Sequence, residues 1–568
     1  MSRPAGALVW LRRAALLAVL VYLALFAWTG QRVGAAEEAF TAGRLDEADR
    51  ILAGVASWHV RAGRVHDALG VVELARGRLV EGRAHLAAAR RGFFHPPAFG
   101  DRAVLARFLR DGLYEPAQIY AAHRLELSGE PAMAMYLGTA ENGLNRLDDA
   151  EKHLALAAAD PALKTQVEAQ RARIAEKRRT GRSSYLVDRS GTPLAAIDVR
   201  SGRASLLVPD LASLLDGPAG LRLTPDDTKR LVRLSLDLEM QRAAEAALGS
   251  RRGALVVIDV ATGGLLAAAS QPAGVPAPGG LAPAALAATY EPGSIIKMIT
   301  LAAALRKGLD VPSMFPQDCP GWLAIDGVAF RDWMPHKRVE SVDQAAAVSC
   351  NLAFGRMGQA VGRDALDAEL RRFGFDTPAG QPAADDAELK YRPGSLLPPD
   401  AAHPDYALAR RAIGLDSIEI TPIGAALIAA GLARGGVPPV AHLVEEKTNI
   451  LGETLYKHDA AQAVPGGDDP LPAGGRELLA RVMRAAVTGA GRAEGTARRA
   501  AVPGVDAAMK TGTSGKNPPG YDALVIGFAP AEKPIIAWGL VAEHAGKAEF
   551  EGARITGDFL KRIQARLR

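Results

Sequence analysis

Cysteine, aromatic residues and an excess of one charge are all scarce in this chain. Its only cysteines are Cys319 and Cys350, so a disulfide framework or a four-ligand zinc site is excluded. The two can form one disulfide or remain free, and the sequence leaves both possibilities open. The net charge of +5 is small for 568 residues and the basic residues are mixed with acidic ones, so no nucleic-acid partner is indicated. The sequence predicts no metal and no cofactor.

A long uncharged run near the start predicts a membrane segment. Residues 14–30 carry no charge, which is at the short end of the roughly 17–25 residues that cross a bilayer. The basic residues before it predict a cytoplasmic N-terminus and an exported remainder. These residues are Arg3, Arg12 and Arg13. Trp10 and Trp28 are placed to mark the two interfaces.

A cleaved signal peptide is the alternative for this segment. The small residues at 33–35 resemble a cleavage site. The length of the apolar run and Trp28 favour an uncleaved anchor. Both alternatives export the rest of the chain.

Residues 35–176 predict a stack of helices. A pattern of a turn residue, a leucine and an acidic residue recurs every 34 residues, with the leucines at Leu45, Leu79, Leu113 and Leu147. This segment resembles the tetratricopeptide family, whose helix pairs have that period. An irregular alanine-rich helical bundle is the alternative. Such stacks bind a partner or act as spacers, and the sequence does not distinguish the two.

The composition changes after a basic, polar stretch at 177–182, which we interpret as a linker. Residues 185–188 and 204–208 are strand-like. A helix is expected from Asp237, its N-cap, to Leu248. Residues 254–259 and 265–269 flank a turn and predict an antiparallel hairpin.

The first chemical motif is Ser294-Ile295-Ile296-Lys297, at the predicted start of an apolar, buried helix. Ser294 is expected in the first turn, with Lys297 one turn on and on the same face. Burial and the positive helix end favour a neutral lysine that can take a proton from the hydroxyl. Taken alone, an N-terminal serine cap with a solvent-reaching lysine explains the same four residues.

Two further motifs are weak singly. Ser349-Cys350-Asn351 places a hydroxyl and an amide in one cleft if the loop is extended, with Cys350 pointing away. Lys510-Thr511-Gly512-Thr513 precedes two predicted paired strands, so it is expected on a neighbouring antiparallel strand. Gly512, having no side chain, is expected to let a substrate backbone approach that strand. An ordinary loop and a strand end with a bulge are the plain alternatives.

Together, in this order, the three motifs resemble the serine-lysine, serine-asparagine and lysine-threonine-glycine set of penicillin-binding proteins and serine β-lactamases. The resemblance to the transpeptidase family extends over roughly residues 183–568. It includes Ile420-Thr421-Pro422 and Gly495-Thr496-Ala497. It implies an α/β (α+β) domain with a central antiparallel sheet flanked by helices.

The resemblance also implies roles for individual residues. Ser294 would attack the penultimate D-Ala carbonyl of a peptidoglycan stem peptide, with Lys297 as base and Ser349 as proton relay. Asn351 would orient Lys297 and the substrate. Three residues would bind the terminal carboxylate of the substrate, namely Lys510, Thr511 and Thr513. The backbone N–H groups of Ser294 and Thr513 would form the oxyanion hole, an amine from a second stem peptide would accept the acyl group, and β-lactams would acylate Ser294.

Three other functions compete with a D,D-transpeptidase. A β-lactamase has the same trio but is more compact. Asn351 and Lys510 are far apart in this sequence, which fits a transpeptidase better. A D,D-carboxypeptidase would use water as the acceptor and normally lacks a repeat domain and a membrane anchor. A non-enzymatic penicillin-binding sensor or scaffold would use the helical repeats, although every expected catalytic side chain is present.

The sequence therefore predicts a class B-like penicillin-binding protein in five segments. They are a cytoplasmic stub and transmembrane anchor at 1–34, tetratricopeptide-like repeats at 35–176, a linker at 177–182, an abbreviated pedestal at 183–250 and a transpeptidase domain at 251–568. No glycosyltransferase signature occurs in 31–180, so glycan polymerisation is not expected. The repeats occupy the place of a full pedestal, and we expect 35–176 to recruit a cell-wall synthesis partner. The predicted location is the bacterial cytoplasmic (inner) membrane, single-pass, with the catalytic domain in the periplasm.

Overall fold

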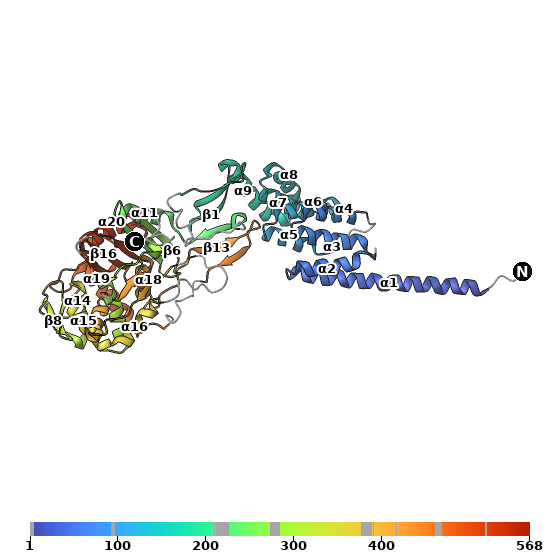
Figure 1. Cartoon of the computed structure of the whole chain (residues 1–568). Helices are drawn as coiled ribbons and strands as arrows, with labels where there is room; N and C mark the ends of the chain where they lie inside the picture. The colour runs from blue at the N-terminus through green and yellow to red at the C-terminus, as the bar shows by residue number, and fades with distance from the viewer. Residues whose placement is uncertain are drawn as a thin grey trace.

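The molecule is elongated, with the N-terminal helix at one end and the catalytic-motif region at the other (Figure 1). The computed structural model describes residues 5–58, 60–91, 97–208, 211, 227–272, 284–376, 389, 391–415, 417–459, 469–516 and 520–567. Arg3, one of the basic residues used to orient the anchor, lies outside the described residues, as does part of the predicted pedestal.

Helix α1 (Ala5–Thr41) is longer than the apolar run that predicted it. Its first half is exposed and apolar, and residues Trp10–Thr41 are long and apolar enough to cross a membrane. Its last part packs into the helical region, where Val33 and Phe40 are buried. The small residues considered as a cleavage site therefore lie inside a continuous helix, and Val33 belongs to its packed face.

Eight helices follow α1 in the described part of this region, and α1 to α8 pack in consecutive antiparallel pairs, with α9 after the last pair. They are α2 (Leu45–Ala56), α3 (Ala62–Ala75), α4 (Leu79–Ala89), α5 (Asp101–Arg110), α6 (Tyr114–Ser128), α7 (Pro131–Gly143), α8 (Leu147–Ala157) and α9 (Lys164–Thr180). Helices α2, α4, α6 and α8 begin at or next to the four recurring leucines. The helical repeat is thus observed, while membership of the tetratricopeptide family stays a prediction.

The turns between paired helices share one backbone conformation. A left-handed residue ends the first helix of each pair, namely Gly43, Gly77, Gly112 and Asn145. The next N–H in each case bonds back to a carbonyl in the preceding helix, as in a Schellman cap. In the third pair the left-handed residue is one position later than in the others, which explains why α6 begins at Tyr114 and not at Leu113.

The stretch 177–182 is not an irregular linker, contrary to expectation. Helix α9 continues to Thr180, Gly181 ends it in a left-handed conformation, and strand β1 (Arg182–Val187) begins at once. Lys177 is buried against α7, and its Nζ donates to the Asn142 carbonyl and to Asn145 Oδ1. Burial of the apolar part of the Lys177 side chain and these two hydrogen bonds keep the basic residues within helix α9.

Strand β1 belongs to a six-stranded sheet with the order β14-β13-β4-β1-β2-β3. The others are β2 (Pro193–Asp198), β3 (Ala204–Leu206), β4 (Leu231–Leu234), β13 (Val444–Thr448) and β14 (Thr454–Lys457). The last two come from the segment assigned to the transpeptidase domain. The pedestal sheet is therefore discontinuous in sequence, and a boundary at residue 250 does not separate it.

The turn between β13 and β14 reaches the helical repeats, where Figure 1 places β13 beside them. Ile450 is buried in the hydrophobic core of the repeats. Its carbonyl accepts from Gln170 Nε2 at 2.8 Å and from Arg173. Tyr114 Oη donates to the Lys229 carbonyl at 2.5 Å on the same side. These contacts join the repeats to the pedestal sheet.

The catalytic-motif region is built on a five-stranded antiparallel sheet, ordered β15-β16-β17-β5-β6. The strands are β15 (Ala508–Lys516), β16 (Gly520–Ala529), β17 (Ile536–Ala542), β5 (Gly253–Asp259) and β6 (Leu265–Gln271). The predicted β5–β6 hairpin and the pairing of β16 with β17 are confirmed. Alternate residues of β5 face opposite cores, with Val256 on one side and Val257 on the other.

Helices cover both faces of this sheet. Helices α11 (Leu238–Leu248) and α20 (Glu551–Arg562) lie on one face, and Asp237 caps α11 as predicted, its side chain accepting from the Met240 N–H. Helix α18 (Pro422–Ala433), buried along its whole length, lies on the other. Beyond α18 is a helical lobe made of α13 (Lys297–Arg306), α14 (Val342–Ala347), α15 (Asn351–Val361), α16 (Arg363–Arg372), α17 (Pro404–Ala412) and α19 (Gly475–Thr488).

Candidate active site

The three sequence motifs meet in one cleft between the sheet edge and the helical lobe. A cavity of about 430 Å³ is lined by residues from all three motifs, including Ser294, Ser349, Asn351, Thr511 and Thr513. The motifs come from the segment before α13, the turn between α14 and α15, and strand β15. The predicted site residues are therefore brought together in space.

Ser294 lies in a 3-10 turn (Gly293–Ile296) that leads into α13, not in the first turn of the α-helix itself. Gly293 has a φ of 58°, and a Cβ there would lie 2.8 Å from the Thr513 carbonyl oxygen. A residue with a side chain would be strained and crowded at this position. The glycine therefore lets the serine segment turn sharply against strand β15, with Ser294 half-exposed in the cleft.

Lys297 is fully buried, one turn after Ser294. Its Nζ lies 2.7 Å from the Ser349 carbonyl, 2.7 Å from Asn351 Oδ1 and 3.1 Å from Ser349 Oγ. Burial lowers the pKa of Lys297 to about 7, against a smaller opposing effect of the Asp332 charge. At neutral pH a large share of this amine is therefore neutral and able to take a proton.

The turn that carries Ser349 and Asn351 is not extended, so the condition under which both side chains were expected in one cleft is not met. Ser349 is left-handed, with a φ of 56°. Cys350 caps α15 by accepting the Ala353 N–H, and Asn351 is the first residue of that helix. Both side chains still reach Lys297, because a left-handed residue followed by a helix start turns them to one side. Cys350 is not part of the cleft lining, although the extended loop on which that prediction depended does not form, and it is bonded to Cys319.

Lys510 is placed differently from the carboxylate-binding role that the resemblance implied. Its side chain is fully buried, and Nζ donates to Ser349 Oγ and to the Thr511 carbonyl, each at 2.8 Å. Burial, reinforced by the nearby charge of Lys297, holds the pKa of Lys510 well below its usual range. Two lysines therefore contact one serine hydroxyl, and Lys510 acts on Ser349 more directly than on the open cleft.

Gly512 faces the nucleophile segment and not open space. A Cβ at this position would lie 2.8 Å from the Pro292 carbonyl and 3.0 Å from the Ile295 side chain. The expectation that this glycine makes room for substrate is therefore corrected, since it makes room for the turn that holds Ser294. Strand β15 is the edge of its sheet, so its outer side remains available for pairing with an extended ligand.

The two threonines of β15 are both engaged through their hydroxyls. Thr511 Oγ1 donates to Thr496 Oγ1 at 2.7 Å. Thr513 Oγ1 accepts from the Ala548 N–H at 3.1 Å, which leaves its proton free to donate. Sequence reasoning did not assign a role to Thr496, although its segment was part of the family resemblance.

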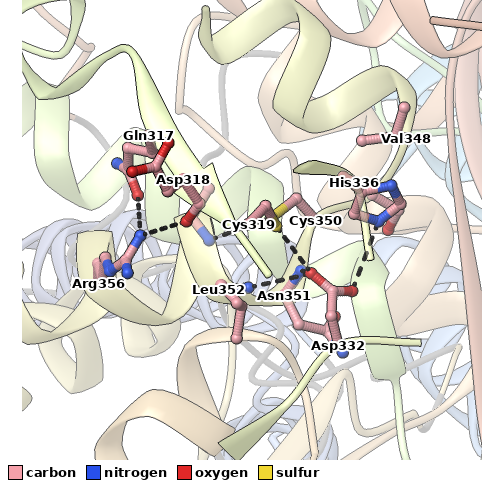
Figure 2. Close-up of a disulfide and its surroundings, with 12 residues drawn as sticks. Gln317, Asp318, Cys319, Asp332, His336, Val348, Cys350, Asn351, Leu352 and Arg356 are labelled. Carbon is pink, nitrogen blue, oxygen red and sulfur yellow. Dashed lines mark hydrogen bonds and ion pairs between the residues drawn. A yellow bond between two sulfur atoms is a disulfide. The ribbon is translucent and has the colours of Figure 1, made fainter. Parts of the chain in front are cut away.

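Asp332 is the buried group that sequence reasoning missed altogether. Figure 2 shows its carboxylate beneath the start of α15, where Oδ2 accepts from the backbone N–H of Asn351 at 2.9 Å and of Leu352 at 3.4 Å. The same oxygen is 3.3 Å from the sulfur of Cys319, and Oδ1 is 3.6 Å from His336 Nε2. An aspartate 19 residues before Asn351 gives no local signal of this contact.

The same cluster contains the residue types that bind metal ions. Cys319, Asp332 and Cys350 each place a ligand atom within 4.8 Å of the others, and no second such group occurs in the ranges that the structure describes. The two sulfurs are bonded to each other here, so they are not free thiolates. The cluster is a disulfide cross-link beside a buried carboxylate (Figure 2).

Comparison with known proteins agrees with this geometry. The family model described as "Penicillin binding protein transpeptidase domain" matches residues 253–565. The chain is 30% identical over 273 residues to peptidoglycan D,D-transpeptidase PbpA of Mycolicibacterium smegmatis, covering 46% of this chain and 51% of that protein. It is 26% identical over 371 residues to peptidoglycan D,D-transpeptidase MrdA of Acinetobacter baumannii, covering 56% and 52%. The chain thus spans about half the length of these curated relatives.

Solved structures show the same fold. The D,D-transpeptidase domain of a peptidoglycan glycosyltransferase from Eggerthella lenta has a TM-score of 0.57 and 26% identity, covering 67% of this chain and 98% of that one. The penicillin G acyl-enzyme complex of penicillin-binding protein A from M. tuberculosis has a TM-score of 0.56 and 22% identity, covering 67% and 99%. With more than half of its length matched by the family model, this chain belongs to the penicillin-binding protein transpeptidase family.

Proposed function

We propose that this protein is a membrane-anchored peptidoglycan D,D-transpeptidase that works through an acyl-enzyme on Ser294. The observation that carries the proposal is the buried amine of Lys297, held by Ser349 and Asn351, which line the same cleft as Ser294. A neutral lysine beside a serine hydroxyl is a general base for nucleophilic attack. The names of the relatives support the same activity.

In the acylation step, Ser294 Oγ attacks the carbonyl carbon of the penultimate D-Ala, and its proton passes to Lys297 Nζ. The bond from that carbonyl to the terminal D-Ala nitrogen breaks. The leaving nitrogen takes a proton from the Ser349 hydroxyl, which regains one from Lys297. The contacts of Ser349 Oγ with both Lys297 and Lys510 support this relay.

In the second step, an amine of another stem peptide attacks the ester carbonyl and the bond to Ser294 Oγ breaks. A proton from the attacking amine returns to Oγ through Lys297. The outcome is a new amide and a regenerated serine, with no net proton uptake by the enzyme. β-Lactams would acylate Ser294 by the first step and stay bound to it.

The backbone groups proposed for the oxyanion hole come from adjoining segments. A Cβ built on Gly293 lies 3.3 Å from the Thr513 nitrogen, so the backbone next to Ser294 touches that of Thr513. Two N–H donors aimed at one carbonyl oxygen would stabilise the developing negative charge. Thr513 is proposed to bind the terminal carboxylate by donating its free hydroxyl proton, and Thr511 to do so once its hydroxyl turns away from Thr496, with Lys510 supporting them from beneath.

We further propose that α1 is an uncleaved anchor in the bacterial cytoplasmic membrane, with the N-terminus inside and the catalytic domain in the periplasm. The packing of Val33 and Phe40 into the helical repeats supports retention of the helix, because removing it would expose that core. Protease added outside spheroplasts should then digest the catalytic domain and leave the N-terminus protected.

The repeats are proposed to bind a cell-wall synthesis partner. A cavity of about 570 Å³ lies between α4, α6, α7 and α8. Its lining combines apolar side chains such as Leu86 and Ile119 with Arg83 and Arg146. The two glutamates of the lining, Glu126 and Glu141, are paired with Arg90 and His153, so the remaining charge is basic. A partner with an acidic, partly apolar segment fits this lining. Charge reversal of both arginines should reduce the captured envelope proteins, and an unchanged set would contradict this proposal.

The deciding experiment for the catalytic proposal uses the purified full-length protein. Labelled penicillin should modify the wild type and not Ser294→Ala. Incubation with labelled lipid-linked precursor polymer should yield dimeric crosslinks. Trimmed monomers alone would indicate a carboxypeptidase. Rapid release of the label as hydrolysed penicillin would indicate a β-lactamase. Penicillin binding without any peptidoglycan product would indicate a sensor.

A further inference from the structure

The turn between α2 and α3 carries an exposed tryptophan and basic side chains that the proposed function does not use. It lies beside α1 where the apolar run ends. We propose that Arg32 of α1, Arg61 of the turn and Arg64 of α3 form a site for the phosphate of an anionic phospholipid. This arginine site would hold the repeats against the outer face of the cytoplasmic membrane. The inference goes beyond the transpeptidase function and rests on the proposed anchor, α1.

The tryptophans of α1 place the turn at the depth of the lipid headgroups. At a rise of about 1.5 Å per residue, Trp10 and Trp28 are about 27 Å apart, close to the thickness of the hydrocarbon core. Trp28 packs edge-on against Trp58 of the turn, with ring centres 6.2 Å apart. Trp58 is nevertheless 53% exposed. Because tryptophan is enriched at membrane interfaces, two adjoining rings at this depth indicate that the turn contacts the bilayer.

Arg61 lies against the last part of the apolar run. Its guanidinium carbon is 3.6 Å from the centre of the Phe26 ring, and its Nη1 is 3.2 Å from a Cβ built on Gly30. Phe26 and Gly30 lie on one face of α1, because residues four apart are neighbours on a helix. An arginine at a membrane edge packs its stem on apolar surface and keeps its charge at the headgroups. Arg61 is therefore held by α1 at the depth where lipid phosphates lie.

The arginine site contains no neutralising acid. Partial burial, reinforced by the nearby charge of Arg64, lowers the pKa of Arg61. The Nε atoms of Arg32, Arg61 and Arg64 are buried and lack hydrogen-bond partners among the described residues. In the same ranges none of the three lies within 4 Å of a carboxylate, and Arg64 Nη2 donates only to the Ala98 carbonyl, at 3.3 Å. These cations are positioned by the fold and left without a counter-charge.

Other arginines of the repeats are paired with acids. Arg76 binds Asp46 and Asp49, and Arg124 binds Asp101. The missing counter-charge at the arginine site is therefore a local property and not a general feature of the helical stack. A phosphodiester supplies one negative charge and several acceptor oxygens, which the guanidinium group binds through paired hydrogen bonds. A lipid of this kind reaches the site from the bilayer beside α1 without displacing any part of the fold.

Lipid bound here would fix how the molecule stands on the membrane. Helix α1 continues without a break from the apolar run into the repeats. The rest of the elongated molecule extends away from that helix toward the catalytic region (Figure 1). A second membrane contact beside α1 would oppose tilting of the repeats. The catalytic cleft would then be held at a constant distance from the membrane.

The test compares the full-length protein in nanodiscs of phosphatidylcholine alone and with about one-third phosphatidylglycerol. Hydrogen exchange of the backbone amides in residues 60–66 should be slower in the anionic discs by about fivefold or more, because each arginine near anionic lipid contributes about that factor. The difference should vanish at about 1 M salt, where charges are screened within about 3 Å. Equal exchange in both discs would overturn the proposal. The same slowing by glycerol phosphate in neutral discs would assign the site to soluble phosphate and not to lipid.

Variants assign the effect to the arginine site. Arg61→Gln combined with Arg64→Gln should abolish the difference between the two kinds of disc. Arg178→Gln combined with Arg179→Gln makes the same charge change at exposed positions near the end of α9 and should behave as wild type. An undiminished difference in the first double variant would contradict the proposal.

Trp58 tests the depth of the turn independently. Lipids brominated near the headgroup end of their acyl chains should quench the tryptophan fluorescence of Trp58→Phe less than that of the wild type. Trp322→Phe is the matched control, because this residue of β8 (Trp322–Ile325) is also 53% exposed, and it should not lower the quenching. Unchanged quenching in Trp58→Phe would place the turn away from the bilayer and refute the site.

Failure of the proposed anchor or of the proposed catalysis would be seen separately. A cleaved anchor would appear as a shortened intact mass and as protein that does not enter nanodiscs. Loss of the catalytic function would appear as absence of penicillin labelling at Ser294, which does not depend on the lipid present.

Discussion

The helical repeats and the catalytic region each bury a lysine in nearly the same surroundings. Lys177 donates to the Asn142 carbonyl and Asn145 Oδ1, and Lys297 donates to the Ser349 carbonyl and Asn351 Oδ1. Burial lowers the pKa of Lys177 to about 8 and that of Lys297 to about 7. The two sites differ in what else is present, because only Lys297 also contacts a serine hydroxyl and adjoins a serine in an open cleft.

This comparison shows that a lowered lysine pKa is not by itself a catalytic feature. Desolvation is the largest cause at both sites and arises wherever a lysine is enclosed. In the repeats, the lysine ties α9 to the α7–α8 turn. In the catalytic region, the same kind of contact holds the amine for which we propose a proton exchange with Ser294 and Ser349.

Replacing each lysine should show the largest difference between the two sites. Lys297→Met should slow acylation by labelled penicillin by about 10²–10⁴-fold, the usual contribution of a general base. Lys177→Met is the matched control and should leave the acylation rate within a factor of about two, although it loses two hydrogen bonds between helices. Equal losses in the two variants would contradict the assignment of Lys297 as the base.

The pH dependence of acylation tests whether Lys297 acts as a base. The neutral amine is the active form, so the rate should fall as pH drops through about 7, where Lys297 becomes protonated. The charge of Asp332 opposes the lowering of this pKa. Asp332→Asn should therefore lower the pKa of Lys297 further and move the acidic limb of the profile by up to about one pH unit to lower pH. A limb that stays in place or moves to higher pH would refute this coupling.

Two glycines offer an intermediate test. Gly512→Ala places a Cβ against the Pro292 carbonyl. Overpacking of this kind lowers the free energy of unfolding by about 1–3 kcal/mol. The variant should also slow acylation, because the segment that bears Ser294 is displaced. Gly54, on α2, has no atom within 4 Å of a built Cβ. Gly54→Ala should instead stabilise by up to about 1 kcal/mol through helix propensity. Thermal unfolding and penicillin acylation of both variants measure the contrast, and a harmless Gly512→Ala would contradict the close approach.

The smallest effect on chemistry is expected at the contact between the two regions. Ile450→Ala should lower the stability of the repeats by about 2 kcal/mol, since a buried isoleucine is truncated. Penicillin acylation should be unchanged, because Ile450 is remote in structure from the catalytic residues. Calorimetry should show the unfolding of the repeats separating from that of the catalytic region, and a single unshifted transition would argue against coupling through this turn.

Much of the helical region was predictable because its determinants are local. A left-handed glycine or asparagine, a following leucine and an acidic first turn recur along the chain, and each helix pair contacts its sequence neighbours. The β5–β6 hairpin and the Asp237 cap were predictable for the same reason. The catalytic trio was predictable only through family resemblance, since none of its motifs is specific by itself.

Other features depended on contacts between segments far apart in sequence. The pedestal sheet recruits β13 and β14 from more than 200 residues after β4, and the β13–β14 turn inserts Ile450 into the repeats. No periodicity or turn signal near residue 450 encodes that partner. The buried Asp332 beneath α15 is equally invisible in the sequence, because an aspartate in a polar segment is ordinarily solvated.

The sequence by itself determined an apolar helix at the start, a 34-residue helical period and an antiparallel sheet, and through the family resemblance it indicated which residues would carry the proposed chemistry. Tertiary structure decided how those residues act. It turned Lys510 toward Ser349, packed Gly512 against the segment that bears Ser294, and joined Cys319 to Cys350 behind the cleft. The physical reason is that residue type and spacing fix local conformation, whereas desolvation and close packing arise only when distant segments enclose a group.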